Sequence, residues 1–203
     1  AQGLQQNVEH IKHIVAAQQT YAKASGVQEH LVMADLVETA LQMSEASQPG
    51  VTLAIVREFS SVPTVVADRH KVLQILVNLI GNARQALEAT ADPRRIVLRI
   101  ASVETHRVIV EVSDNGVGIS PENLTRIFSH GFTTKPNGHG FGLHSGANAA
   151  REMGGTLHAR SPGLGLGSTF TLELPVQGIS RNVSERSRGG VVASSVTTPP
   201  LAA

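Results

Sequence analysis

Four short segments rich in glycine or asparagine occur in a fixed order along this chain, and they constrain its fold more than any other feature. They are Asn78–Ala83, Asp114–Gly118, Gly138–Leu143 and Gly167–Phe170. Each segment alone is a weak signal, because glycine-rich turns and asparagine-containing helices are common. An asparagine-bearing helix, an Asp-led glycine turn and a glycine-rich helix start rarely coincide by chance. Together they predict a nucleotide site.

Composition narrows the class of protein. The chain has 203 residues, 41% of them hydrophobic, which is enough for a single packed core. A net charge of +1 without a basic tract disfavours nucleic-acid binding, and the lack of cysteine excludes disulfides and thiolate metal sites. No apolar run reaches the roughly 20 residues that span a bilayer, and no signal peptide is recognisable. We expect a cytoplasmic fragment. Its first residues resemble the interior of a longer protein, and that protein could carry a membrane anchor upstream.

The first part of the chain is predicted to be an amphipathic helix. Between Leu4 and Lys23, apolar residues recur at steps of three and four, and Ser25-Gly26 ends the pattern. An isolated helix of this length is marginal in water, so its apolar stripe is expected to pack against something else. The partner is a helix pair completed upstream or a second copy of the chain; the alternative is that the helix folds back onto the following domain.

Hydrophobic periodicity predicts mixed helices and strands from residue 35 to residue 175. Asp35 and Glu38 have the spacing of a capping box, and Asp68 is placed to cap a long helix. This order predicts an α/β two-layer sandwich, in which helices cover one face of a mixed, mostly antiparallel sheet. The predicted helices are 36–43, 69–89 and 141–153, and the predicted strands are 51–59, 62–67, 96–103, 108–112, 156–160 and 169–174.

The long helix contains the first candidate ligands. Gln74, Asn78 and Asn82 follow one another at four-residue steps and form a polar ladder on an otherwise apolar helix. A magnesium ion bound to phosphates prefers hard oxygen ligands, and the amide oxygen of Asn82 is suitable. The alternative is that the three amides are simply solvated.

Asp114 lies where a predicted strand ends. A carboxylate there can accept a hydrogen bond from the amino group of adenine, while Gly116 and Gly118 let the backbone approach a flat base. This geometry would select adenine over guanine. The alternative is an ordinary Asp-Asn-Gly turn between strands.

The third segment indicates a phosphate site. Gly138, Gly140 and Gly142 precede a helix, whose free amides can bind phosphate oxygens. The pattern is neither a Walker loop nor a Rossmann fingerprint, because Gly-Lys-Ser/Thr is missing and no strand leads directly into it. The preceding stretch 128–137 is long enough to be a lid, with Phe128 and Phe132 as anchors or as ordinary core residues.

On these motifs the chain resembles the ATP-binding catalytic domain of sensor histidine kinases, within the superfamily of gyrase-type topoisomerases, a heat-shock chaperone and mismatch-repair ATPases. The resemblance covers Leu31 to Pro175, and Phe132-Thr-Thr-Lys135 is similar to kinases of the nitrogen-regulator type. It implies that ATP and Mg²⁺ are cofactors, with Asn82 as the metal ligand and Asn78, Asn82 and Lys135 as catalytic residues. The nucleotide-binding positions that it implies are Asn78, Asn82, Asp114, Gly116, Gly118, Ile119, Phe128, Phe132, Thr133, Thr134, Lys135, Gly138, His139, Gly140, Phe141, Gly142, Leu143 and Thr169.

The same resemblance implies a division of the chain and a reaction. Residues 1–29 resemble the second helix of a dimerisation and phosphoacceptor hairpin plus a linker, residues 30–176 the catalytic domain, and residues 177–203 form a disordered tail rich in Ser, Arg, Gly, Thr and Pro. None of the nine histidines lies in a phosphoacceptor box, so the acceptor is expected upstream.

The implied activity is transfer of the γ-phosphoryl of ATP to a histidine and then to a response regulator, in a homodimer whose hairpin belongs to the same or the sister chain. The alternatives are an ATPase-driven conformational machine of the gyrase or chaperone type, a serine kinase that regulates sigma factors, and a module of this fold that no longer binds ATP.

Overall fold

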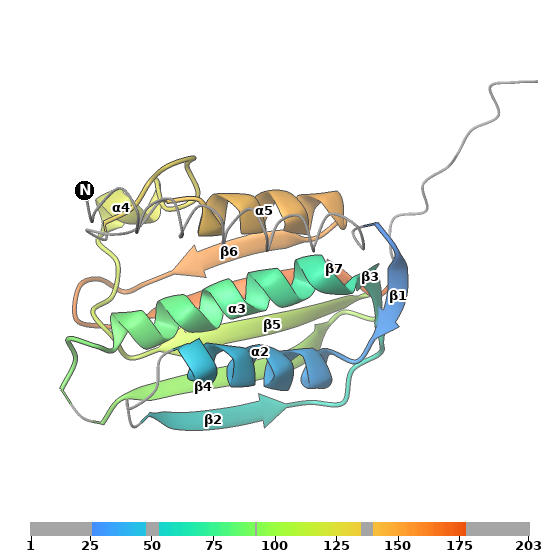
Figure 1. Ribbon diagram of the computed structural model, residues 1–203, viewed down its shortest axis with the longest axis horizontal. Coiled ribbons are helices and arrows are strands. Elements are labelled where there is room, and N and C mark those ends of the chain that lie inside the picture. The colour runs from blue at the N-terminus through green and yellow to red at the C-terminus, as the bar shows by residue number, and fades with distance from the viewer. Residues whose placement is uncertain (1–25, 48–52, 92, 135–139, 178–203) are drawn as a thin grey trace, which may run out of the picture.

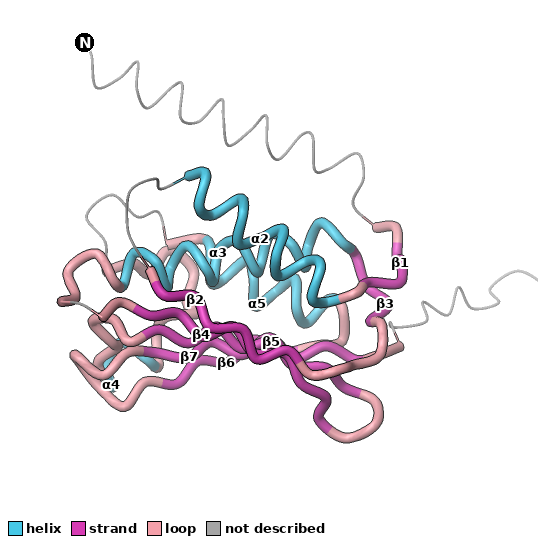
Figure 2. The backbone as a smooth tube through the Cα atoms, turned by 90° about the horizontal axis from the view of Figure 1, so that it is seen from below, coloured by secondary structure: helices cyan, strands magenta, loops and turns pink. Residues whose placement is uncertain are grey.

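In the computed structural model, the described residues, 26–47, 53–91, 93–134 and 140–177, form two layers. A five-stranded sheet has the order β2-β4-β5-β7-β6, and β1 pairs with β3 in a separate two-stranded sheet. Helices α2, α3 and α5 cover one face of the larger sheet (Figures 1 and 2). The elements are β1 (Gln28–Leu31), α2 (Met33–Ser47), β2 (Ala54–Phe59), β3 (Val65–Asp68), α3 (Arg69–Ala86), β4 (Arg95–Val103), β5 (Arg107–Asp114), α4 (Pro121–Leu124), α5 (Gly142–Glu152), β6 (Thr156–Arg160) and β7 (Ser168–Pro175).

The predicted α/β sandwich with a mixed, mostly antiparallel sheet is confirmed. β2 runs parallel to β4, and the other neighbours in the large sheet are antiparallel. Alternation along β4 and β5 explains the two faces: Ile96, Leu98 and Val110 are buried beneath the helices, while Arg99 and Glu111 project from the opposite face. Burying the apolar side chains of both layers is the main force that holds the helices on the sheet.

On the face without helices, Glu111 is almost buried among polar partners. Its carboxylate accepts hydrogen bonds from Arg99 and Arg160, each at 3.0 Å, and from the Thr171 hydroxyl at 3.3 Å. A buried carboxylate must be paired in this way, because leaving it unpaired would be strongly unfavourable. On the helix face, the Arg57 guanidinium of β2 lowers the pKa of the Glu38 carboxyl of α2 through a hydrogen bond of 2.6 Å.

Several predicted elements need correction. The first helix begins at Met33, not after Asp35, because the Val32 carbonyl already accepts the Leu36 amide; Asp35 lies inside the first turn and is not its cap. The predicted strand 62–67 is shorter at its start, because pairing begins at Val65. The long helix ends at Ala86, before the predicted residue 89.

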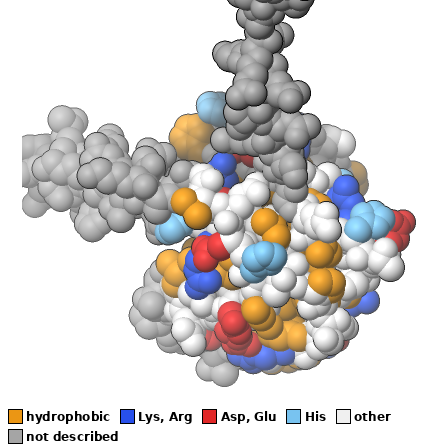
Figure 3. Space-filling view, turned by 90° about the vertical axis from the view of Figure 1, so that its right-hand side faces the viewer, with side chains coloured by type: hydrophobic (Ala, Val, Ile, Leu, Met, Phe, Trp, Pro, Cys, Tyr) orange, Lys and Arg blue, Asp and Glu red, His pale blue; other side chains and the backbone are white. Residues whose placement is uncertain are grey.

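Two elements were not predicted. The sequence does not predict β1, because Gln28, Glu29 and His30 are polar and show no alternation of apolar and polar residues. All three are exposed, and the strand is defined by its pairing with β3. The short helix α4 is capped by the Ser120 hydroxyl. Figure 3 views the end of the molecule at β1 and β3, where hydrophobic, charged and histidine side chains are interspersed. The predicted helix 4–23 and the tail beyond residue 177 lie outside the described residues.

Candidate functional site

The asparagine ladder lies on α3, whose position is fixed by its two ends and its apolar face. The Asp68 carboxylate caps the helix, as predicted, by accepting the amides of His70 and Lys71. Asn78 and Asn82 are both half-buried, whereas Gln74 is exposed. The side chains that fix α3 on the sheet are Val72, Ile75, Leu76, Leu79, Ile80 and Ala83.

The Asn78 amide is enclosed rather than solvated. Its Nδ2 atom is buried and makes no hydrogen bond in the part of the chain that the structure describes. It lies against the backbone of Gly142, where any Cβ would overlap the Asn78 amide. The first segment therefore contacts the third, and the enclosed amide fits a ligand better than it fits the alternative of solvated side chains.

Asp114 ends β5 with a nearly buried carboxylate that is 8% exposed. The Gly116 amide donates to its Oδ1 at 2.9 Å, and the Ser168 hydroxyl donates to its Oδ2 at 2.6 Å. These bonds orient the carboxylate and still leave lone pairs for a further donor. The second bond comes from a strand 54 residues away in the sequence, so it joins the end of β5 to the start of β7 at this carboxylate.

Ser168 contacts Asp114, although only its neighbour Thr169 was among the predicted nucleotide-binding residues. Ser168 pairs with Asp114 in the β5–β7 register, while Thr169 pairs with Ser113 and its hydroxyl lies 2.9 Å from the Ser113 hydroxyl. Successive strand residues point to opposite faces, so Thr169 and Ser168 cannot both serve the helix side. Phe170 is buried in the same strand, and Ser168 lies two residues before it. The apolar Phe170 was therefore the signal in the sequence that Ser168, and not Thr169, points to the helix side.

The glycine turn after Asp114 is held from two sides. The Val117 amide donates to the Ala86 carbonyl at the end of α3, at 3.1 Å. On the other side, Gly167 has φ +74° and approaches the Asp114 carbonyl so closely that a Cβ would overlap it. The second and fourth segments therefore meet at the end of α3, and glycine is required there for both conformation and space.

The phosphate-loop candidates reach the start of α5. This helix begins at Gly142, and its N-cap residue, Phe141, provides no side-chain cap. Phe141 is half-exposed, while Leu143 is partly buried against the core. The amides of the first turn are thus left without a capping side chain, which is the condition for binding an anion.

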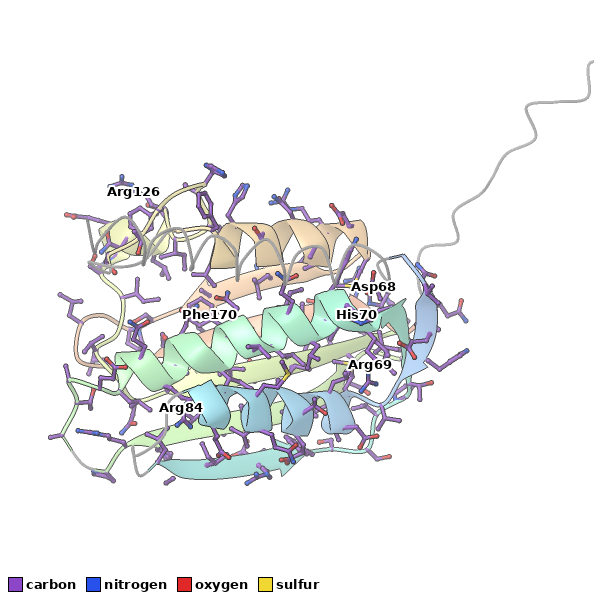
Figure 4. All side chains as sticks on the ribbon, in the orientation of Figure 1. Asp68, Arg69, His70, Arg84, Arg126 and Phe170 are labelled. Carbon is purple, nitrogen blue, oxygen red and sulfur yellow. The ribbon has the colours of Figure 1, made fainter. Side chains whose placement is uncertain are left out.

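The described part of the predicted lid, residues 128–134, follows α4 in the chain. Phe128, Phe132 and Ile119 are partly buried and pack against the core, which fits both predicted alternatives for the two phenylalanines, lid anchors and ordinary core residues. Thr133 and Thr134 are exposed. The Arg126 guanidinium lies 4.9 Å from the centre of the Phe132 ring; Figure 4 labels Arg126 beside α4. Lys135, Gly138 and His139 lie outside the described residues, and Gly140 packs against Gly131.

A shallow hollow of about 310 Å³ opens beside Asp114 on the side of the β6–β7 connection. No residue of α3 or α5 lines it, so it is not the whole of the predicted site. Its lining residues are Asp114, Arg160, Ser161, Pro162, Leu166, Gly167, Ser168 and Thr169.

The described ranges contain no group of three or more His, Cys, Asp or Glu side chains placed to hold a metal ion. Within the same ranges, every helix is too short or too polar to cross a bilayer.

The fold is that of histidine kinase catalytic domains. The structure aligns with the catalytic domain of histidine kinase ThkA, nucleotide-free, with a TM-score of 0.64 and 28% identity over 74% of this chain and 96% of that one. It also aligns with full-length ShkA in complex with AMPPNP, with a TM-score of 0.69 and 25% identity over 86% of this chain and 37% of that one.

Sequence comparison identifies the family. Residues 67–178 match the histidine kinase-, DNA gyrase B-, and HSP90-like ATPases, and the chain belongs to this family. It is 39% identical to the sensor histidine kinase ZraS of Escherichia coli K12 over 116 residues, or 57% of this chain and 24% of ZraS. It is 33% identical to the sensor protein ChvG of Agrobacterium fabrum over 167 residues, or 76% of this chain and 28% of ChvG. The chain thus spans about a quarter of the length of these relatives.

Proposed function

We propose that this chain is the ATP-binding catalytic part of a two-component sensor histidine kinase. The observation that supports the proposal best is the meeting of the four segments around α3. Asn78 contacts Gly142, and the turn after Asp114 is held between Ala86 and Gly167. Distant parts of the sequence are brought together at one end of the sheet, as a ligand site requires. The nitrogen-regulator type of kinase remains a proposal that rests on Phe132-Thr-Thr-Lys135.

Asp114 would recognise adenine. Its carboxylate is buried and oriented by Gly116 and Ser168, so it can accept a hydrogen bond from the adenine amino group. Guanine has a carbonyl at that ring position, and two acceptors would then face each other. A buried acceptor left unpaired in this way is unfavourable, and this is how a polar site rejects the wrong base.

The phosphates would lie between α3 and the start of α5. The uncapped first turn of α5 offers amides to phosphate oxygens, and Asn82 and Asn78 offer amide oxygens from the facing helix. Neutral amide oxygens suit a Mg²⁺ ion that takes its other ligands from phosphates and water. The buried Nδ2 atom of Asn78 is a donor, so it would serve a phosphate oxygen and not the ion. When bound, the ion would neutralise charge that develops on the phosphates. Lys135 is proposed to reach the terminal phosphate.

The reaction that we propose is phosphoryl transfer to a histidine upstream of this chain. The imidazole nitrogen forms a bond to the γ-phosphorus as the bond to the bridging oxygen breaks, which leaves ADP and a phosphohistidine. The phosphoryl group then passes to an aspartate of a response regulator. The protein contributes positioning and electrostatic stabilisation, and the dimerisation hairpin of the same or the sister chain presents the acceptor.

An ATP-hydrolysing machine of the gyrase or chaperone type is less well supported. Such an enzyme would need a general-base carboxylate near the attacking water at the position of Asn78. An amide at that position has no basic oxygen that could take the proton.

Calorimetry on the 203-residue chain tests the nucleotide site. With Mg²⁺ and a non-hydrolysable ATP analogue, we expect Asp114→Asn to weaken binding by roughly tenfold or more, because an amide donor replaces a carboxylate acceptor. Ser113→Ala is the matched control, since Ser113 is on the same strand but bonds to Thr169 on the other face. Failure of the unmutated chain to bind would refute the proposed site.

A second experiment tests the kinase activity. The chain is incubated with labelled ATP, with and without a phosphoacceptor hairpin from a similar kinase. Labelled protein that forms only when the hairpin is present is the expected result. Rapid release of phosphate without any labelled protein would favour the ATPase alternative.

A further inference from the structure

A histidine on α5 connects this helix to the start of the lid. The Nδ1 atom of His144 lies 3.0 Å from the Phe128 carbonyl oxygen, and its Nε2 atom lies 3.1 Å from the Asn148 side-chain nitrogen. His144 is half-buried and lies in the first turn of α5, two residues after Gly142. None of the motif arguments explains this residue.

The two contacts fix the tautomer of the ring. A carbonyl oxygen can only accept, so Nδ1 bears the hydrogen and donates it to Phe128. An amide nitrogen can only donate, so Nε2 accepts from Asn148. Asn148 therefore holds His144 in the form that can bind the Phe128 carbonyl, in the way that second-sphere groups orient an imidazole.

Aromatic contacts extend the connection. The His130 ring lies 5.2 Å from the His144 ring, edge to face, and 5.0 Å from the Phe141 ring. Phe128 and His130 belong to the first part of the lid, while Phe141 and His144 belong to the start of α5. The lid start is thereby held beside the helix end whose amides have no side-chain cap.

We propose that His144 is a positioning residue for nucleotide binding. It holds the Phe128 carbonyl against the first turn of α5, and so fixes residues 128–134, the described start of the lid, beside the amides that would bind phosphates. The proposal rests on the proposed function and deepens it. His144 acts through Phe128 and does not itself contact the nucleotide.

The test uses two replacements of nearly equal size. His144→Asn keeps a donor at the place of Nδ1, because the asparagine Nδ2 occupies the same position along the side chain. His144→Leu has the same shape as asparagine but no donor. A role in packing alone would make leucine the better replacement, whereas a positioning role requires the hydrogen bond to Phe128.

Calorimetry with the full 203-residue chain measures two ligands. With Mg²⁺ and a non-hydrolysable ATP analogue, we expect His144→Leu to weaken binding roughly three- to tenfold, the range of one lost hydrogen bond. His144→Asn should stay within about twofold of the unmutated chain. Adenosine lacks phosphates for the lid to cover, so both variants should bind it about equally well.

Equal affinities of the leucine and asparagine variants for the ATP analogue would overturn the proposal, and so would an equal loss for the analogue and adenosine. If the unmutated chain bound neither ligand, the proposed function itself would fail, which is a different result. If His144→Leu does not fold, His144→Met replaces it, because methionine also lacks a donor and adds no charge beside the proposed phosphate site.

Hydrogen exchange without nucleotide gives an independent test. The Ser129 and Phe132 amides are bonded in the turns that follow Phe128, to the Arg126 and Ser129 carbonyls. Removing the anchor should speed their exchange several-fold in His144→Leu and leave His144→Asn near the unmutated rate. Unchanged rates in the leucine variant would show that His144 does not hold the lid.

Discussion

The N-termini of α3 and α5 differ in whether a side chain caps them. At α3, Asp68 is 5% exposed and its carboxylate accepts the amides of His70 and Lys71 at 3.0 and 3.2 Å, and that of Gly26 at 2.8 Å. At α5, no side chain caps the first turn. We call the capped N-terminus of α3 the closed end and the uncapped N-terminus of α5 the open end. Figure 4 labels Asp68 and His70 at the closed end. One helix satisfies its amides with its own chain, and the other leaves them for a ligand.

The two helices run antiparallel, so their open and closed ends lie at opposite edges of the helix layer. Lys71 near the start of α3 bonds to Glu152 at the end of α5, at 2.6 Å. Asn78, further along α3, meets Gly142 at the start of α5. Both helix ends have a positive electrostatic potential from the backbone, but only the open one can use it to bind an anion. In the proposed function, the closed end therefore contributes to stability and the open end to recognition.

The largest effect is expected from filling the space at the open end. In Gly142→Ala, the added Cβ overlaps the end of the Asn78 side chain, so the amide must turn away from its place between the two helices. Overpacking of this kind is unfavourable by about 1–3 kcal/mol. We expect binding of the ATP analogue to fall roughly 10- to 100-fold, measured by calorimetry.

Gly146→Ala is the matched control, one turn further along α5. Its Cβ would lie 3.4 Å from Leu157 and 3.7 Å from Ile75, which is ordinary contact. Binding should stay within about twofold, because alanine also suits a helix interior. If both variants bound the analogue equally well, the contact between Asn78 and Gly142 would not matter for the site.

Removing the cap at the closed end should lower the free energy of unfolding and leave the affinity for nucleotide nearly unchanged. Asp68→Ala leaves three backbone amides without their acceptor, and we expect it to lower the free energy of unfolding by about 2 kcal/mol, measured by urea denaturation. Asp68→Asn should lose less, because asparagine still caps α3 and fails only at Gly26. Affinity for the ATP analogue in the folded variants should change less than about twofold; a tenfold loss would mean that the two ends are not separate.

The smallest effect is expected from adding a charge to the open end. Phe141→Asp places a carboxylate where the phosphates are proposed to bind, while Phe141→Asn changes the side chain without the charge. We expect aspartate to weaken ATP-analogue binding about two- to fivefold relative to asparagine, less at high salt. Tighter binding by the aspartate variant would contradict an anion site.

The closed end could be predicted from the sequence, and much of the open end could not. Asp68 followed by an apolar periodic run is sufficient to locate a capped helix, and β-branched alternation located β4 and β5. Helix caps and alternation depend on neighbours in sequence, so local patterns reveal them.

The rest depends on contacts between distant segments. That Ser168 and not Thr169 meets Asp114 is decided by the phase of β7, and the bond between His144 and Phe128 exists only because the lid returns to α5. β1 is defined by pairing alone, without an apolar pattern of its own. The roles of Lys135, Gly138 and His139 remain predictions, because these residues lie outside the described part of the chain.

Hydrogen exchange at single-amide resolution tests the central claim most directly. The amides of Gly142, Leu143 and His144 in α5 are compared with those of His70 and Lys71 in α3, with and without Mg²⁺ and the ATP analogue. We predict that the nucleotide slows exchange at the start of α5 and leaves the start of α3 unchanged. Bound nucleotide with unchanged exchange in α5 would contradict the account, since the open helix end would then not be the phosphate site.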